Sequence, residues 1–405
     1  MHVYPIEKLI HLKKNTPDGI TAIYINTTLR TLALSLVGIF VPVFIFMQTQ
    51  ETFGEGIAIG LYGVAIYYLV WRLIVVLMVI PASSLVSKIG FRWCLLLSSL
   101  SLAILLFLFS LVTNNFWVLG IAVFVHAIQT SLYWLSYRSL FVKDGIMGHL
   151  GEEVGTNAIL AKFAAIGGPA LGGLIIAVWG FSYLFWIALV IVLISGLPYF
   201  FMRYHERNST ATLSSVIKWL KVKEHRNEEV SFIGRNIEGF ISTTFWPIFV
   251  FLIVGAYEKQ GLVASLGLVV GAITTLFAGR MFDRKRSLKA FRFGVIWVSI
   301  MYFVRIFVNT LGKLVMVQIA NDIASPFYWI TFDSLVYERA REEDGQVLTF
   351  MVSRMIMVSV ALIAVMGFAI LVAKYDWRFS GMWIFASIAT LFTLTMWEGK
   401  YGKQK

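Results

Sequence analysis

The chain alternates between long apolar runs and short polar segments. Runs such as TLALSLVGIFVPVFIF and CLLLSSLSLAILLFLFSLV carry no charge, and they approach the ~20 residues that an α-helix needs to cross a bilayer. We predict twelve membrane-spanning helices. Their approximate limits are 21–47, 57–83, 93–113, 116–142, 154–179, 181–201, 231–254, 261–280, 289–309, 314–338, 347–373 and 377–398.

The composition excludes an ordinary water-soluble domain. Of 405 residues, 59% are hydrophobic and 14% are charged, with a mean hydropathy of +0.79, whereas soluble domains carry about 25% charged residues. The single cysteine, Cys94, excludes a disulfide framework and a cysteine-rich metal site. The first 20 residues are polar and basic and precede a full span, so we expect a tail that stays on the membrane surface, not a cleaved signal peptide.

Lysine and arginine fall on one side of the predicted spans. Both termini and the loops after spans 2, 4, 6, 8 and 10 hold 25 of the 34 lysine and arginine residues, and the loops on the opposite side hold 4. Cytoplasmic loops carry this excess, so we expect both termini in the cytoplasm of a cell with the chain in its cytoplasmic (inner) membrane. Attraction to anionic lipid headgroups then explains the net charge of +12, and a nucleic-acid partner is not required to account for it.

A repeat divides the chain into two parts. SLYWLSYRSLF (131–141) recurs as PFYWITFDSLV (326–336), PVFIF (42–46) as PIFVF (247–251), and WGFS (179–182) as WRFS (377–380). An arginine stands twelve residues before each of Pro42 and Pro247. Because six spans is an even number, the repeats are parallel, related by an axis along the membrane normal. We predict six-helix bundles at 1–201 and 231–405, joined by a cytoplasmic linker at 202–230, in which SSVIKWLKVK favours a short amphipathic helix.

This pattern resembles the major facilitator superfamily of transporters over nearly the whole chain. The family's signature, a glycine followed after three residues by Asp-Arg, appears in GRMFDRKR, with Gly279, Asp283 and Arg284 in place. The copy after span 2 keeps Gly90 and Arg92 but has Ser87 and Lys88 for the Asp-Arg pair. The resemblance implies an all-α integral membrane fold, with twelve transmembrane helices in two pseudo-twofold-related six-helix bundles and a latch at these loops.

A second stretch resembles the family's exporters. IGGPALGG at 166–173 places small residues and Pro169 in span 5, where small residues also let helix backbones approach closely. The exporters carry an arginine early in span 4, but VFVHAIQTSLYW has His126 and no arginine there. An export signature and a plain packing face both remain open.

Polar residues inside the spans are the candidate substrate site, because such residues are costly in a membrane and face protein or water. The resemblance places spans 1, 4, 7 and 10 around a cavity. The candidates are Arg30, Arg72, His126, Gln129, Tyr133, Trp134, Lys162, Glu238, Asp322, Tyr328, Trp329 and Arg354. Arg305 is interpreted as structural. Arg138 and Asp333, which occupy equivalent places in the repeated phrase, are candidates for a gate that pairs and parts, or they simply end their helices in water.

The excess of cations favours a small solute that is anionic or bears a carboxylate or phosphate, held through bidentate bonds to arginine. We predict a monomeric secondary transporter working by alternating access as symporter or antiporter, with Glu238 and Asp322 as candidate carriers of a coupling proton (H+). No cofactor, metal or nucleic acid is expected, and no HExxH, GxSxG or CxxC motif points to an enzyme. Multidrug or amphiphile efflux and a non-transporting sensor of the same fold are the alternatives, and a channel is a less favoured one.

Overall fold

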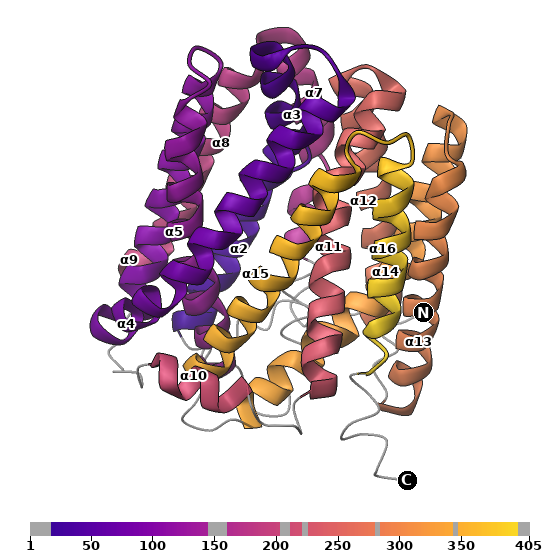
Figure 1. Cartoon of the computed structure of the whole chain (residues 1–405). Helices are drawn as coiled ribbons and strands as arrows, with labels where there is room; N and C mark the ends of the chain where they lie inside the picture. Colours follow the sequence, from indigo (N-terminus) through magenta and orange to yellow (C-terminus); the bar gives the residue numbers. More distant parts are fainter. Residues whose placement is uncertain are drawn as a thin grey trace, which may run out of the picture.

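The computed structural model describes residues 18–144, 160–202, 211–220, 226–279, 284–342 and 347–395, and these residues form helices and connecting turns without a strand (Figure 1). In chain order the helices are α2 (Asp18–Val37), α3 (Phe40–Phe53), α4 (Ile57–Val112), α5 (Val118–Asp144), α7 (Gly168–Trp179), α8 (Phe181–Gly196), α9 (Pro198–Phe201), α10 (Leu213–Leu220), α11 (Arg226–Val254), α12 (Tyr257–Gly279), α13 (Arg284–Val304), α14 (Leu311–Glu342), α15 (Val347–Val372) and α16 (Arg378–Phe392), with a short 3₁₀ turn, η2, at Arg305–Phe307.

Three of the spans are interrupted or joined in ways that the sequence pattern does not show. The first span is broken into α2 and α3 by a turn at Gly38, whose amide donates to the Leu34 carbonyl at 2.7 Å. The second and third spans are joined in α4, where Gly90 alone leaves the helical conformation, with φ at 82°. Glycine adopts this left-handed conformation without steric cost, so one residue makes the connection that we predicted as a loop.

The chain is a multi-pass membrane protein with twelve membrane segments. Eight helices of the described residues are long and apolar enough to span a bilayer, and α4 is one of them. Counting the two parts of α4 separately and adding α12, α14 and the shorter α16 gives the twelve segments that we predicted.

The helices form two halves, α2–α9 and α11–α16. In the first half α4 packs along α5 and α8, and α2 packs along α7 and α8; in the second half α13 packs along α14 and α16, and α11 along α16. The main contacts between the halves are α4 with α15 and α7 with α12. These two contacts involve spans 2 and 11 and spans 5 and 8, which are exchanged by the predicted repeat.

The repeated phrases make the same contacts in both halves. Phe44 of PVFIF packs on Phe181 of WGFS with ring centroids 4.9 Å apart, and Phe249 of PIFVF packs on Phe379 of WRFS at 5.2 Å. The chain is therefore built from two copies of one six-helix unit, as the repeat predicted.

The glycines of IGGPALGG form a close packing face. A Cβ on Gly172 would collide with the main chain at Leu36, and one on Gly173 with the main chain at Tyr257. This face lets α7 approach both α2 and α12. Close helix packing alone explains these small residues. They therefore do not decide between an export signature and a plain packing face.

The predicted amphipathic helix exists and lies at one end of the bundle. It is α10, drawn below the two halves in Figure 1. Val216 and Trp219 are buried, while Leu213, Ile217 and Lys218 are exposed. Trp219 packs edge-on against Phe350 of α15. The limits of the two bundles and the cytoplasmic place of this linker stay predictions.

Candidate functional site

A cavity of about 630 Å³ lies between the two halves, within the ~300–1,000 Å³ range of small-molecule sites. Nine of the predicted site and gate residues line it. They are Arg30, His126, Gln129, Tyr133, Trp134, Arg138, Lys162, Trp329 and Asp333. Most come from α2, α5 and α14, the helices of spans 1, 4 and 10, which the resemblance placed around a cavity.

The cavity is cationic. Among its described lining residues are three basic side chains, Arg30, Arg138 and Lys162, and one carboxylate, Asp333. Each cation lies near an aromatic ring. The Arg138 guanidinium is 4.7 Å from the Trp134 ring centre, and the Lys162 ammonium is 5.2 Å from that of Trp329. Such contacts offset only part of the cost of removing a charge from water.

Arg30 is the most informative of these cations. Only 5% of its surface is exposed, and its guanidinium lies 3.8 Å above the Tyr133 ring. Its Nη1 atom has no hydrogen-bond partner among the described residues. A buried guanidinium with an unused donor beside a cavity is a place where an anion can bind.

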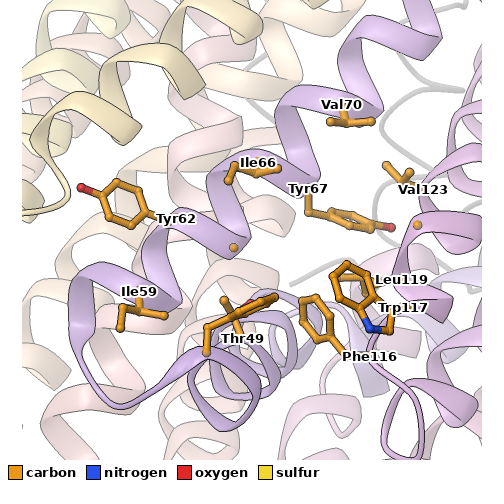
Figure 2. A pocket seen from close by; sticks show the side chains of 13 residues that line it. Thr49, Ile59, Tyr62, Ile66, Tyr67, Val70, Phe116, Trp117, Leu119 and Val123 are labelled. Carbon is orange, nitrogen blue, oxygen red and sulfur yellow. The ribbon is translucent and has the colours of Figure 1, made fainter.

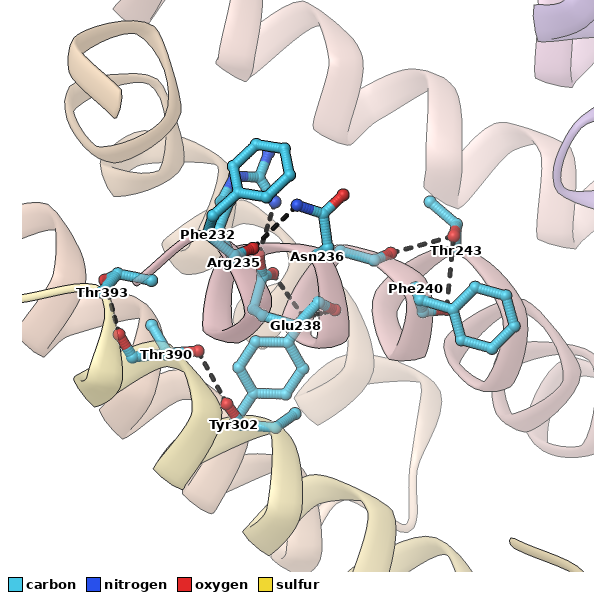
Figure 3. A network of polar contacts seen from close by, with 11 residues as sticks. Phe232, Arg235, Asn236, Glu238, Phe240, Thr243, Tyr302, Thr390 and Thr393 are labelled. Atoms are coloured by element: carbon cyan, nitrogen blue, oxygen red, sulfur yellow. Dashed lines mark hydrogen bonds and ion pairs between the residues drawn. The ribbon is translucent and has the colours of Figure 1, made fainter. Parts of the chain in front are cut away.

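The second half repeats this arrangement with one addition. Arg235, the counterpart of Arg30, lies 5.1 Å from the ring of Tyr328, the counterpart of Tyr133. Arg235 also donates to Glu238 at 2.8 Å, and Tyr302 donates to the same carboxylate at 2.7 Å (Figure 3). The position in α2 that corresponds to Glu238 is Ala33. The second arginine is neutralised by its own helix, whereas the first is not.

His126 is held by its neighbours in α4. Its ring stacks on Trp71 at 4.2 Å, and its Nδ1 atom is 3.1 Å from the Tyr67 hydroxyl. Arg72 lies 3.9 Å from the centre of the same Trp71 ring. His126 therefore presents a fixed edge to the cavity, while Arg72 supports the wall from behind and is not among the residues that line it.

A second chamber of about 580 Å³ adjoins the first and shares four lining residues with it, Thr31, Leu34, Ala165 and Leu268. Asp322 lines this chamber and accepts a hydrogen bond from Gln318, which accepts one from Trp246 at 2.7 Å. The charge of Lys162 acts on Asp322 from the first half. Because Lys162 also donates to the Gly271 carbonyl at 3.0 Å, it links the two halves beside both chambers.

Besides Arg72, three predicted site residues line neither chamber. Glu238 and Tyr328 are buried in the second half around Arg235, and neither lines a chamber. Arg354 is fully buried, with its guanidinium 4.4 Å from the Phe232 ring and 3.9 Å from the carboxylate of Glu228. These contacts hold α11 and α15 together and leave none of the three facing a solute.

Known proteins give no match by sequence and a clear one by structure. No family model and no curated protein matches the chain. The crystal structure of a variant of the E. coli fucose:proton symporter FucP aligns over 95% of this chain and 98% of its own, with a TM-score of 0.66 and 14% identity. FucP in the outward conformation gives 0.66 at 13% identity, over 95% and 99%. The human organic anion transporter MFSD10 (TETRAN) gives 0.70 at 12% identity, over 94% and 98%.

The chain has the major facilitator superfamily fold. This confirms the resemblance drawn from the repeat and the GRMFDRKR motif, and at these identities it shows the fold alone. Each of these three solved structures is that of a transporter.

The latch residues of the facilitator motif are only partly visible. Arg92 donates to the Phe200 carbonyl and, at 3.1 Å, to the Met202 carbonyl, which ties the start of the third span to the end of the sixth. Gly279 ends α12, while Asp283 and the Arg284 side chain lie outside the described residues. The latch therefore stays a prediction.

Three neighbours of the predicted residues were missed. Gln318 stands four residues before Asp322 on α14, so helical periodicity alone could have placed both on one face. Trp71 and Tyr67 recur at a spacing of four on α4 and meet His126 from another helix. No pattern within either helix predicts that meeting.

Replacing Glu238 with glutamine is expected to lower the melting temperature in detergent, because Arg235 would then be a buried cation without its counter-charge. The cost of breaking such a pair is about 3–5 kcal/mol. Glu258→Gln is the matched control, since no described cation pairs with that carboxylate. Equal melting temperatures for the two variants would contradict the structural role of Glu238.

Proposed function

We propose that this protein is a secondary transporter that moves a small organic anion, bearing a carboxylate or phosphate, across the cytoplasmic membrane by alternating access. The observation that carries the proposal is the difference between Arg30 and Arg235. The same arginine–tyrosine pair occurs in both halves, but among the described residues only the second has a carboxylate beside it. The facilitator fold supports transport, because the cavity lies between two repeated halves.

The cavity supports an anion over a lipophilic cation. A cation would meet Arg30, Arg138 and Lys162 at close range in surroundings of low polarity, where like charges repel strongly. The aromatic walls suit the apolar part of an organic acid equally well. One structural neighbour is named an organic anion transporter; this shows that the fold can serve such a substrate.

We further propose that Asp322 is the proton carrier, if transport is coupled to protons. Glu238, the other candidate from the sequence, is held by Arg235 and Tyr302 away from both chambers. Asp322 lines a chamber and interacts with Lys162 across the two halves. Protonation of this carboxyl group would remove its attraction for Lys162 and so weaken one link between the halves.

The gate formed by Arg138 and Asp333 also remains a proposal. The two residues line the same cavity, and no ion pair joins them in this structure. The charges of Arg138 and Arg235 both act on Asp333. This arrangement agrees with a pair that is parted in one conformation and formed in another.

We also propose that both termini lie in the cytoplasm, because the lysine and arginine residues are concentrated in the loops on that side.

Introducing the missing carboxylate tests the anion site. Ala33→Glu places an acid one helical turn from Arg30, as Glu238 is placed from Arg235, and should weaken anion binding. Ala33→Gln has nearly the same volume without the charge and should keep it. The measurement is the rise in melting temperature with monocarboxylates, dicarboxylates, phosphate monoesters and lipophilic cations. Loss of one charge-assisted bond predicts an affinity roughly 10- to 100-fold weaker.

Two outcomes would contradict the anion site. Equal stabilisation of the Ala33→Glu and Ala33→Gln variants by acids would show that the charge at Arg30 is not used. Stabilisation of the wild type by lipophilic cations alone would replace the proposal with amphiphile efflux. Binding of acids without measurable flux into vesicles would identify a sensor.

Proton coupling is tested in proteoliposomes with the acid identified above. Wild-type accumulation should respond to an imposed pH gradient. Asp322→Asn should abolish that response yet preserve exchange of labelled for unlabelled solute, because the solute site is left intact. Glu258→Gln should behave as the wild type. Wild-type transport that ignores the gradient removes proton coupling from the proposal.

The gate is tested by exchanging its charges. Arg138→Asp and Asp333→Arg should each abolish transport, since like charges then face one another, and the double exchange should recover part of the rate. Uptake into the same vesicles is the measurement, with thermal unfolding to check that each variant is folded. A double variant as inactive as the single ones would remove the pairing.

A further inference from the structure

A third depression lies on the first half, away from the central cavity (Figure 2). Its α3 wall lies at the end of the bundle opposite α10 (Figure 1). We call it the lateral groove, and its volume is about 510 Å³. It is formed by α3, α4 and the start of α5. Its lining residues include Phe53, Ile59, Ile66, Val70, Phe116 and Val123.

The lateral groove offers almost nothing polar. Its two buried polar side chains are already used: the Thr49 hydroxyl donates to the Ile45 carbonyl at 2.7 Å, and the Tyr67 hydroxyl is 3.1 Å from His126. Tyr62 and Trp117, which are partly and largely exposed, add their polar atoms only at the edge. A ligand that fits this groove is therefore a hydrocarbon chain.

The lateral groove opens where the bilayer lies. Ile66 and Trp117, on its two sides, are 52% and 72% exposed, and the neighbouring Ile121 is 60% exposed. Ile66 belongs to span 2, and Trp117 and Ile121 belong to the start of span 4. None of the three lines the central cavity. Large apolar side chains that are exposed on the outside of a membrane span, away from such a cavity, face lipid, so the groove is continuous with the lipid-facing surface.

The dimensions of the groove match one leaflet. Its lining residues on α4 run from Ile59 to Val70, which is about 16 Å along a helix that rises 1.5 Å per residue. Half of the roughly 30 Å hydrocarbon core is about 15 Å. Gly120 leaves a gap in the α5 wall, because a Cβ there would have no neighbour within 4 Å.

We propose that the lateral groove binds one acyl chain of a membrane phospholipid. The chain lies along α4 between Phe53 and Val123 and covers the ring of Tyr67. That ring is shared with the substrate site, because its hydroxyl is bonded to His126 in the cavity wall. The bound lipid is thus a structural ligand of the wall that carries His126.

The test uses the full chain in phosphatidylcholine vesicles that contain a trace of phosphatidylcholine with a photoreactive diazirine in one acyl chain. After illumination, the label is mapped by peptide mass spectrometry. We expect it to be enriched on the lining segments of α4 and α5, relative to the exposed face of α15 at Val360 and Leu371.

The matched variants place the same side chain in two open positions. Gly120→Phe fills the groove and should reduce labelling there to the level of α15, whereas Gly367→Phe, where an added Cβ also meets nothing within 4 Å, should leave it unchanged. Ile66→Trp blocks the groove from the lipid side and gives a second variant that needs no repacking.

Three results would overturn the proposal. They are wild-type labelling of α4 and α5 no higher than that of α15, labelling that neither Gly120→Phe nor Ile66→Trp reduces, and loss of the enrichment when free fatty acid is added in excess. The last result would assign the groove to a free acid and not to a phospholipid.

Discussion

The structure depends on how buried cations are held inside a membrane. An arginine taken from water into hydrocarbon surroundings costs several kcal/mol unless the protein compensates it. This chain compensates by laying each guanidinium on an aromatic ring, as with Arg30 on Tyr133 and Arg235 on Tyr328. The ring supplies only part of the lost solvation. Whether a carboxylate completes it decides whether the arginine is structural or remains available for a solute.

Arg305 shows the same constraint in a different setting. Its side chain is 1% exposed and lies 4.1 Å from the Trp246 ring and 4.2 Å from the Tyr302 ring. Tyr302 in turn donates a hydrogen bond to the Glu238 carboxylate, and the same carboxylate forms an ion pair with Arg235. Two cations therefore share one carboxylate through a tyrosine. The acid that looked like a solute ligand offsets part of this buried positive charge, which explains its place away from the chambers.

Much of this architecture could be predicted from the sequence, because a membrane limits the possibilities. Spans follow from apolar length, and the repeat predicted two equivalent halves, which the matching contacts of Phe44 and Phe249 agree with. The place of α5 beside the cavity followed from the resemblance. The role of Glu238 did not, although its spacing of three from Arg235 was visible as an ion pair on one helix. The stacking of His126 on Trp71 depends on how two helices are rotated against each other, and no single sequence states that rotation.

The asymmetry between the halves has a consequence for alternating access. The first half holds the available cation, Arg30, while Lys162 beside it donates to the Gly271 carbonyl of the second half. In the proposed mechanism, an anion in the cavity and that carbonyl compete for the same ammonium group, and a charged acceptor is the stronger of the two. Occupation of the site by the proposed anion would therefore weaken a bond between the halves. A conformational change can follow a ligand only if the ligand interacts differently with the two states, and the bond from Lys162 to Gly271 supplies such a difference at the site itself.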